Sequence, residues 1–160
     1  MNKSQLLQQV IARLEDDLLQ AQQAAQTAYE TATHEENIAE NKYDTLGLEA
    51  SYLATGQARR AAAIRQTLAN WKQLVLRTFD PLLGIQLGAL IELSDNEDRH
   101  QCLFLGPEGA AMKLQQDDQT VQVIGPQAPL GQILLGKTVG DEVTLRVGSG
   151  VQLLEIVRIG

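Results

Sequence analysis

An acidic segment near residue 40 is the part of this sequence best suited to chemistry. Residues 34–43 read HEENIAENKY, with three glutamates, two asparagines and a tyrosine within ten positions. Glu36 and Glu40 are four positions apart, so a helical turn would place both carboxylates on one face. Carboxylate oxygens are common ligands of Mg²⁺. Glu36 and Glu40 are therefore chemically adequate to hold a metal ion.

A simpler role stays open for the same segment. The glutamates also suit a solvated turn, in which they would stabilise the positive amino-terminal end of the following helix. His34 suits the carboxyl-terminal cap of the preceding helix better than a ligand role. No second histidine or cysteine lies at ligand spacing from it, so the sequence predicts no zinc or iron site.

Two long helical stretches flank the acidic segment and must position it. In the first, apolar residues recur at alternating steps of four and three, the spacing of a coiled-coil seam. These residues are Leu7, Ile11, Leu14, Leu18, Ala21, Ala25, Ala28 and Ala32. The second stretch, 51–76, contains good helix formers and no proline. Together they predict an antiparallel coiled-coil hairpin over residues 1–79, with its acidic tip at 34–44.

Charge is unevenly distributed along the chain. The net charge is −7, which argues against independent binding to DNA, because nonspecific affinity comes from phosphate neutralisation. Residues 51–79 nevertheless carry Arg59, Arg60, Arg65 and two further basic residues, and no acidic one. These arginines are either a solvated face that offsets the acidic first helix or contacts to an RNA end or to an acidic protein wall.

The composition changes near residue 80, where glycine, valine, leucine and isoleucine replace alanine and glutamine. Frequent turn residues bracket short apolar runs, which predict strands at 89–93, 101–105, 111–114, 121–124, 142–147 and 151–159. Residues 129–136 begin with proline and end with glycine, and so predict one short helix. The expected fold is α+β, with a second domain over residues 80–160.

Two further features concern the environment of the protein. The single cysteine, Cys102, lies in an apolar run, so we expect a buried thiol in a strand and no intrachain disulfide. The first residues have no apolar core like that of a signal peptide, and no later stretch is long enough to span a bilayer. We expect a cytoplasmic protein with no membrane partner.

Two segments resemble one known family. Residues 39–44, AENKYD, are similar to the Glu-Asn-x-x-Tyr region at the coiled-coil tip of bacterial Gre transcript-cleavage factors. Residues 126–143, PQAPLGQILLGKTVGDEV, resemble the Ser-Pro-Leu-Gly, Ala-Leu-Leu-Gly-Lys and Gly-Asp-x-Val signature of the same family. The closing run LLEIV at 153–157 is similar to its last strand. The resemblance covers nearly the whole chain, in order.

The resemblance implies a fold and a partner. The carboxyl-terminal body would be a sheet with one helix of the FK506-binding-protein type, which docks on RNA polymerase at the rim of its secondary channel. Pro129, Leu130 and Gly131 would be part of that contact, so we expect Leu130→Asp to weaken binding without unfolding the domain. Arg59, Arg60, Arg65 and Tyr43 would contact RNA or the channel.

The resemblance also implies a mechanism. The hairpin would enter the channel and bring its tip beside the Mg²⁺ of the polymerase active site, where Glu40 would be a ligand of the shared metal. Glu40, Glu36 and Asn37 are the candidate catalytic residues that the resemblance implies for this tip. The protein would bind no cofactor alone, would meet the nascent RNA 3′ end and DNA only inside the elongation complex, and would stimulate the polymerase rather than act as an enzyme.

The tip departs from the family pattern in two ways. The family carries an acidic residue three positions before the glutamate of Glu-Asn, and here that position is Asn37. Tyr43 also follows Asn41 by one residue fewer than the pattern expects. The alternative is therefore a non-cleaving channel regulator of initiation or pausing. Peptidyl-prolyl isomerase activity ranks last, because Phe104 is the only aromatic residue after Pro81 and cannot line a pocket alone.

Overall fold

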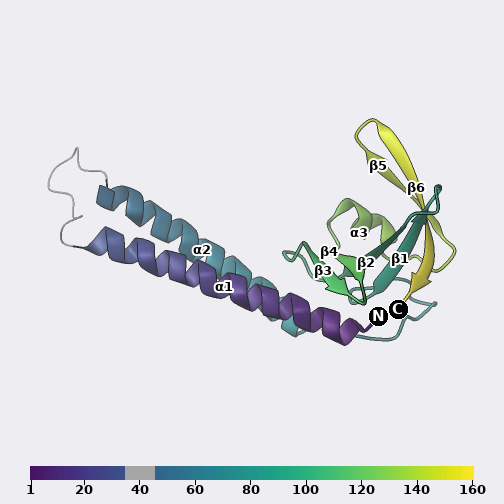
Figure 1. Ribbon diagram of the computed structural model, residues 1–160, viewed down its shortest axis with the longest axis horizontal. Helices are drawn as coiled ribbons and strands as arrows, with labels where there is room; N and C mark the ends of the chain where they lie inside the picture. The colour runs from purple at the N-terminus through teal and green to yellow at the C-terminus, as the bar shows by residue number, and fades with distance from the viewer. Residues whose placement is uncertain (35–45) are drawn as a thin grey trace. The chain divides into compact units, whose positions relative to one another are not determined.

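The computed structural model describes residues 1–34 and 46–160 (Figure 1). The chain forms two compact units, which we describe separately. The hairpin unit is Ala12–Ala69, and the sheet unit is Met1–Ile11 together with Asn70–Gly160. The fold is α+β, as predicted: two amino-terminal helices precede a six-stranded sheet that carries one short helix.

Helices α1 (Lys3–Thr33) and α2 (Leu46–Lys72) supply the hairpin unit, in which they lie side by side and run in opposite directions (Figure 1). Neither contains proline, and both are rich in alanine, leucine and glutamine, which lose little side-chain entropy in a helix. Leu14, Ala21 and Ala28 are buried on α1 at steps of seven. Ala50, Ala61 and Leu68 are buried on α2. The predicted coiled-coil spacing thus agrees with the buried residues of α1 from Leu14 onward.

The predicted seam is wrong at the start of α1. Leu7 and Ile11 are only half-buried, whereas Leu6 and Val10 are completely buried. These residues belong to the sheet unit, together with the end of α2 and the strands, and not to the hairpin unit. The buried face is therefore rotated by one residue, about 100° around the helix.

The sheet unit contains six strands in the order β3-β4-β2-β1-β6-β5. Strands β2 and β4 are parallel, and the other neighbours are antiparallel. Each predicted strand is confirmed to within two residues at each end. The bounds are β1 (Leu90–Asp95), β2 (His100–Leu105), β3 (Met112–Gln116), β4 (Gln119–Ile124), β5 (Glu142–Val147) and β6 (Gly150–Ile159).

The main core lies between the sheet and the short helix α3 (Pro129–Leu134). Ile91, Leu93, Leu103 and Leu105 point to this face, and Leu134 of α3 is completely buried with them. Phe104 alternates to the opposite face, because successive strand side chains point to opposite sides.

Trp71 covers Phe104 on that opposite face, with ring centroids 5.9 Å apart. Trp71 is completely buried and belongs to the sheet unit. The predicted domains, 1–79 and 80–160, thus have a different boundary from the compact units, because both ends of the helical region pack with the body.

Cys102 lies in β2 as predicted, but its side chain is half-buried rather than buried. It pairs in register with Glu92 of β1 and Val121 of β4, on the side of β2 away from Leu103. Among the described residues, no helix combines the length and the hydropathy that crossing a membrane requires.

Candidate functional site

The predicted polymerase contact lies at the start of α3. Pro129 occupies the first turn of the helix, where its missing N–H leaves no hydrogen bond unmade. Ala128 precedes it in an extended conformation, and its carbonyl accepts the backbone N–H of Gln132 at 2.9 Å. The Glu108 carboxylate accepts the backbone N–H of Gln127 and so ties this loop to the loop after β2. The turn is therefore held from both sides.

The three predicted contact residues have different surroundings. Pro129 is exposed, Leu130 is half-buried against the main core, and Gly131 is buried. A Cβ atom at Gly131 would collide with the carbonyl oxygen of Gly125, so glycine is required there for packing. Leu130→Asp would place a charge against the core, and it is therefore not the clean test of binding that the sequence suggested.

The sheet unit also has an apolar surface that the sequence analysis did not single out. A groove of about 810 Å³ runs between the segment after α2 and the end of α3. Val75, Leu83, Leu87 and Leu135 line it with side chains that are 38–61% exposed. We call these four residues the apolar groove. Arg77 also lines the groove.

A hydrogen-bonded turn next to the groove carries one more exposed leucine. The Asp80 side chain accepts the backbone N–H of Leu82 at 2.9 Å, and the Asp80 carbonyl accepts those of Leu83 and Gly84. Leu82 is 93% exposed at the outside of this turn. Leu82 adjoins Leu83 of the apolar groove, and a contiguous exposed apolar patch is typical of a protein contact site.

The turn is fixed to the end of α3. The backbone N–H of Ile85 donates to the Lys137 carbonyl at 2.8 Å, and that of Gly136 donates to the Ile85 carbonyl at 2.9 Å. Gly84 has a positive φ of 73°, and a Cβ atom there would collide with the backbone of Gly136. The signal in the sequence is the run Asp80-Pro81-Leu82-Leu83-Gly84, which places apolar residues inside a turn motif.

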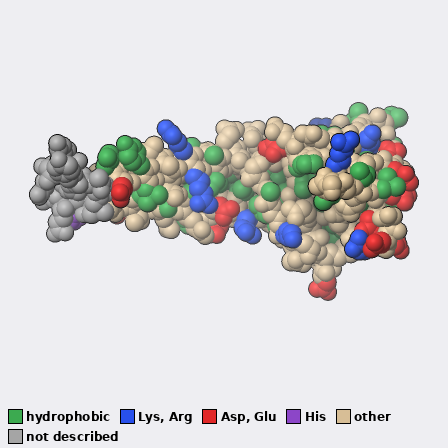
Figure 2. Space-filling model, turned by 90° about the horizontal axis from the view of Figure 1, so that it is seen from above, with side chains coloured by type: hydrophobic (Ala, Val, Ile, Leu, Met, Phe, Trp, Pro, Cys, Tyr) green, Lys and Arg blue, Asp and Glu red, His purple; other side chains and the backbone are tan. Residues whose placement is uncertain are grey.

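The hairpin unit contains the predicted RNA or channel contacts. Arg59, Arg60 and Arg65 are all exposed on α2. Helical geometry separates Arg59 from Arg60 by about 100° and Arg60 from Arg65 by about 140°, so the three do not share one face. Figure 2 likewise shows the blue side chains of the hairpin as separate groups.

Arg65 differs from the other two arginines because it lies beside a hollow of the hairpin unit. It lines a shallow hollow between α1 and α2, together with Tyr29 and small or amide side chains of both helices. The hollow is open to solvent and has both polar and apolar walls. Arg65 and Tyr29 thus offer a cation and an aromatic face at one place on the hairpin unit.

The candidate tip residues Glu36, Asn37, Glu40 and Tyr43 lie outside the described residues. Their predicted roles, including the metal ligand Glu40, stay predictions. Among residues 1–34 and 46–160, no three His, Cys, Asp or Glu side chains are grouped so that they could hold a metal ion.

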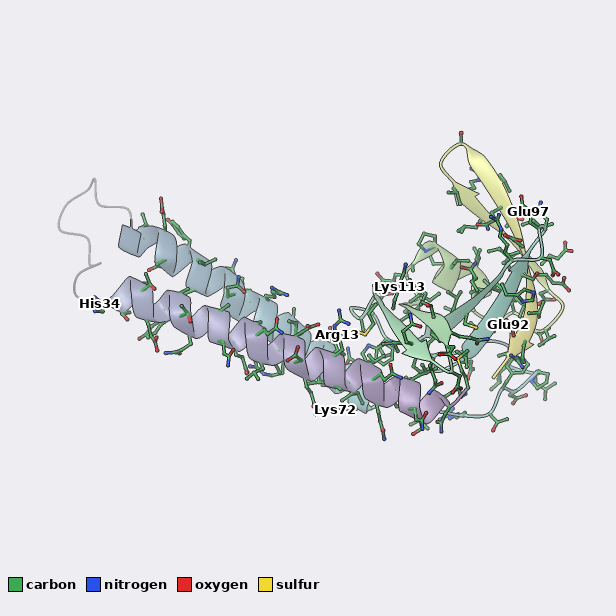
Figure 3. All side chains as sticks on the ribbon, in the orientation of Figure 1. Arg13, His34, Lys72, Glu92, Glu97 and Lys113 are labelled. Carbon is green, nitrogen blue, oxygen red and sulfur yellow. The ribbon has the colours of Figure 1, made fainter. Side chains whose placement is uncertain are left out.

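A polar network covers the outer side of β1. Glu92 accepts from Arg158 at 2.9 Å and lies 3.0 Å from the His100 ring nitrogen (Figure 3 labels Glu92). At the β1–β2 turn, backbone N–H groups of Arg99 and Glu97 and the Arg99 guanidinium hold the pKa of Asp95 below its ordinary value. Burial, followed by the Glu92 carboxylate, raises the pKa of the Cys102 thiol. The thiol therefore stays protonated and a weak nucleophile.

Solved structures similar to this chain include two Gfh1 proteins and one GreA/GreB transcription elongation factor. The Gfh1 protein (GreA factor homolog 1) of Thermus thermophilus is 22% identical over 94% of each chain, with a TM-score of 0.40. Thermus aquaticus Gfh1 is 22% identical over 92% of each chain, with a TM-score of 0.42. A prokaryotic transcription elongation factor GreA/GreB from Nitrosomonas europaea is 21% identical over 60% of this chain and 78% of its own, with a TM-score of 0.39.

No curated protein matches this chain in sequence. Residues 84–160 match the family model described as "Transcription elongation factor, GreA/GreB, C-term". The match runs from the glycine that packs against Gly136, through α3, to the last residue of the chain. Residues 84–160 of this chain therefore belong to the carboxyl-terminal domain family of GreA/GreB transcription elongation factors.

Proposed function

We propose that this protein is a Gre-type elongation factor that binds RNA polymerase at the rim of its secondary channel and inserts the hairpin towards the active site. The match of residues 84–160 to the family is the observation that carries the proposal. The protein would act in the cytoplasm, and would meet nascent RNA and DNA only within the elongation complex.

The sheet unit supplies the docking surface in this proposal. Pro129 is exposed on a firmly held turn, and Leu82 and the apolar groove are exposed at the other end of α3. Exposed apolar side chains on a hydrogen-bonded turn suit an interface, because a preorganised backbone loses little entropy when a partner covers it.

A pair of substitutions tests this surface. Leu82→Asp should weaken binding to the core polymerase by tenfold or more, on the order of 1.4 kcal/mol, without changing thermal stability. Val151→Asp is the matched control, because Val151 is also highly exposed and lies in the same unit, on β6. Equal affinity of Leu82→Asp and wild type would remove this turn from the docking surface.

The tip supplies the chemistry in this proposal. Glu40, with Glu36 in place of the carboxylate that Asn37 lacks, would position a Mg²⁺ ion of the polymerase, and carboxylate oxygens suit that hard cation. A metal held in this way supplies Lewis-acid activation for the cleavage of backtracked RNA. The polymerase performs the cleavage, and this protein is not an enzyme by itself.

Cleavage of nascent RNA in backtracked elongation complexes, with the cognate polymerase and Mg²⁺, tests the tip. Wild type, Glu40→Ala and Asn37→Asp are compared, after equal polymerase binding has been confirmed for each. Short 3′ products with wild type that disappear with Glu40→Ala would support a working cleavage factor. Products that appear only with Asn37→Asp would identify a binder whose second carboxylate has been lost.

A second candidate function rests on Asn37. An amide at the position of the family's acidic residue removes one negative charge from the tip. The alternative is therefore a non-cleaving regulator that enters the same channel and modulates initiation or pausing. Absence of cleavage in all three proteins, with binding confirmed, would favour it.

Arginines of α2 have a supporting role in the proposal. Arg59, Arg60 and Arg65, with Tyr43 of the tip, would contact the RNA 3′ segment or acidic channel walls. Because the three arginines point in different directions, we expect each to contact a different surface. Arg65→Gln should reduce the salt dependence of polymerase binding, which is measured by titration at two ionic strengths.

A further inference from the structure

The two edge strands of the sheet differ in how far other parts of the chain cover them. At one edge, side chains from the start of α1 reach β3. The amide of Gln9 donates to the Gln115 carbonyl at 3.4 Å, and the Gln116 side chain bonds both Gln5 and the backbone N–H of Asn2 at 2.9 Å. An edge covered in this way cannot readily pair with another strand.

At the other edge, β5 has a neighbouring strand on one side only. Figure 1 shows β5 and β6 as a hairpin that extends away from the other strands of the sheet unit. Four of the six β5 residues are exposed, and Val147 at its end is 58% exposed. Helix α3 contacts β5, but among the described residues no other strand pairs with it. Its outer row of backbone groups is a template for a further strand.

The sequence of β5 is complementary to itself. When two copies of Glu142–Val147 are paired antiparallel about Thr144, Thr144 lies opposite Thr144 of the second copy. Val143 then lies opposite Leu145, which is half-buried against the main core and has surface left to cover. Glu142 lies opposite Arg146. Apolar and opposite-charge cross-strand pairs both stabilise a sheet.

The charges of β5 are unbalanced within one molecule. Glu142 is directly opposite Glu155 of β6, and like charges across a strand pair are destabilising. Arg146 is opposite Val151. In the part of the chain that the structure describes, neither Glu142 nor Arg146 belongs to an ion pair. A second copy would supply the missing counter-charge to both.

We propose that two copies of this protein associate through β5, antiparallel about Thr144, with Glu142 of each copy paired to Arg146 of the other. The pairing joins the two sheets into one, and it obeys the two-fold symmetry that a homodimer requires. It involves neither Pro129 nor the apolar groove, so it is independent of the proposed docking on polymerase.

The dimer should be weak. Two paired strands of six residues bury less than the roughly 1,200 Å² of a standard interface. We therefore expect a dissociation constant on the order of tens of micromolar or weaker, outside the micromolar-to-picomolar range of larger interfaces. The ion pairs are exposed, so added salt should weaken the association further.

Sedimentation equilibrium of the full chain, over a concentration range that reaches about 1 mM, tests the proposal. We expect a monomer–dimer equilibrium for wild type. Arg146→Glu should weaken association at least tenfold, because it places two glutamates opposite each other at both ends of the pairing. Glu142→Arg should do the same. The double exchange, Glu142→Arg with Arg146→Glu, should restore wild-type association.

Lys113→Glu is the matched control, because it makes the same charge change on β3, at the covered edge of the sheet (Figure 3). It should leave association unchanged. A wild-type protein that is monomeric throughout the range would overturn the proposal. Association that Arg146→Glu leaves intact, or that the double exchange fails to restore, would overturn the Thr144-centred pairing.

Discussion

The hairpin unit and the sheet unit are held together by different kinds of core. Among the described residues of the hairpin unit, the buried hydrophobic side chains are Leu14, Ala21, Ala28, Ala50, Ala61 and Leu68, four of them alanine. The sheet unit buries isoleucine, leucine, valine, phenylalanine and tryptophan, many of them completely. Because hydrophobic stabilisation is proportional to the apolar area removed from water, the sheet unit gains more from each buried position.

The difference in core composition indicates that the two units have different structural roles. An alanine seam lets two helices approach closely and leaves a slender hairpin, whose helices depend on intrinsic helix propensity more than on packing. A branched and aromatic core specifies one packed arrangement, which can hold an exposed turn such as Leu82 in place. We therefore expect core substitutions to be severe in the sheet unit, and substitutions in the hairpin unit to act mainly through helix propensity.

The largest effect should come from Trp71, which packs on Phe104 in the sheet unit. Trp71→Ala should lower the free energy of unfolding by about 3–5 kcal/mol, because it removes a completely buried aromatic side chain and leaves a cavity. Urea unfolding followed by far-ultraviolet circular dichroism measures this. Trp71→Phe, which refills part of the cavity, is the control and should lose less. A loss below about 1 kcal/mol would contradict the packing of Trp71.

Gly131 tests the close packing of α3. Gly131→Ala should cost about 1–3 kcal/mol, because the new methyl group would overlap the Gly125 carbonyl and push α3 outward. Chemical denaturation compares it with Gly150→Ala, where the nearest atom to a new Cβ lies at 3.4 Å, an ordinary contact. Equal stability of the two variants would show that α3 adjusts without strain.

For Gly56, in the hairpin unit, we expect the opposite effect: substitution by alanine should stabilise the protein. It lies inside α2, and nothing is within 4 Å of a Cβ atom built there. Gly56→Ala should stabilise the helix by about 1 kcal/mol, because alanine loses less backbone entropy. Thermal unfolding of the helical signal measures the gain. Ala58→Gly, the reverse change on the same exposed stretch, should lose a similar amount, and a destabilised Gly56→Ala would mean that a contact had been blocked.

The smallest effect concerns pH and the β1–β2 turn. The pKa of Asp95 is lowered in the folded state, so its carboxylate stabilises the fold above its unfolded pKa of about 3.9. That contribution is lost as the pH falls through the folded value. Asp95→Asn should therefore be less stable than wild type at neutral pH and should lose less stability on acidification. Parallel curves of unfolding free energy against pH would disprove this role.

Local patterns predicted the elements well. Period-two apolar runs between glycine and aspartate turns located all six strands to within two residues. The proline and glycine that bracket 129–136 located α3. Heptad spacing described α1 from Leu14 onward but failed at Leu7 and Ile11, because a helix that packs on a sheet need not bury the same face as a helix that packs on a helix.

The candidate site was predicted less completely. The signature Pro129-Leu130-Gly131 was placed on the correct element, yet only Pro129 of the three residues is exposed. Leu82, which is the most exposed large apolar residue among those that the structure describes, was not singled out. Exposure depends on what folds over a residue, and a leucine in a turn has the same sequence signal whether it is covered or not.

The sequence by itself determined the order of two helices and six strands, the position of α3 and the acidic segment at 34–44. These follow from propensity, periodicity and turn residues, which act over a few positions of the chain. Tertiary structure alone decided that Met1–Ile11 and Trp71 belong with the sheet, that Gly131 must be glycine, and that β3 is a covered edge while β5 is open. Those outcomes depend on contacts between residues far apart in sequence, which local patterns do not encode.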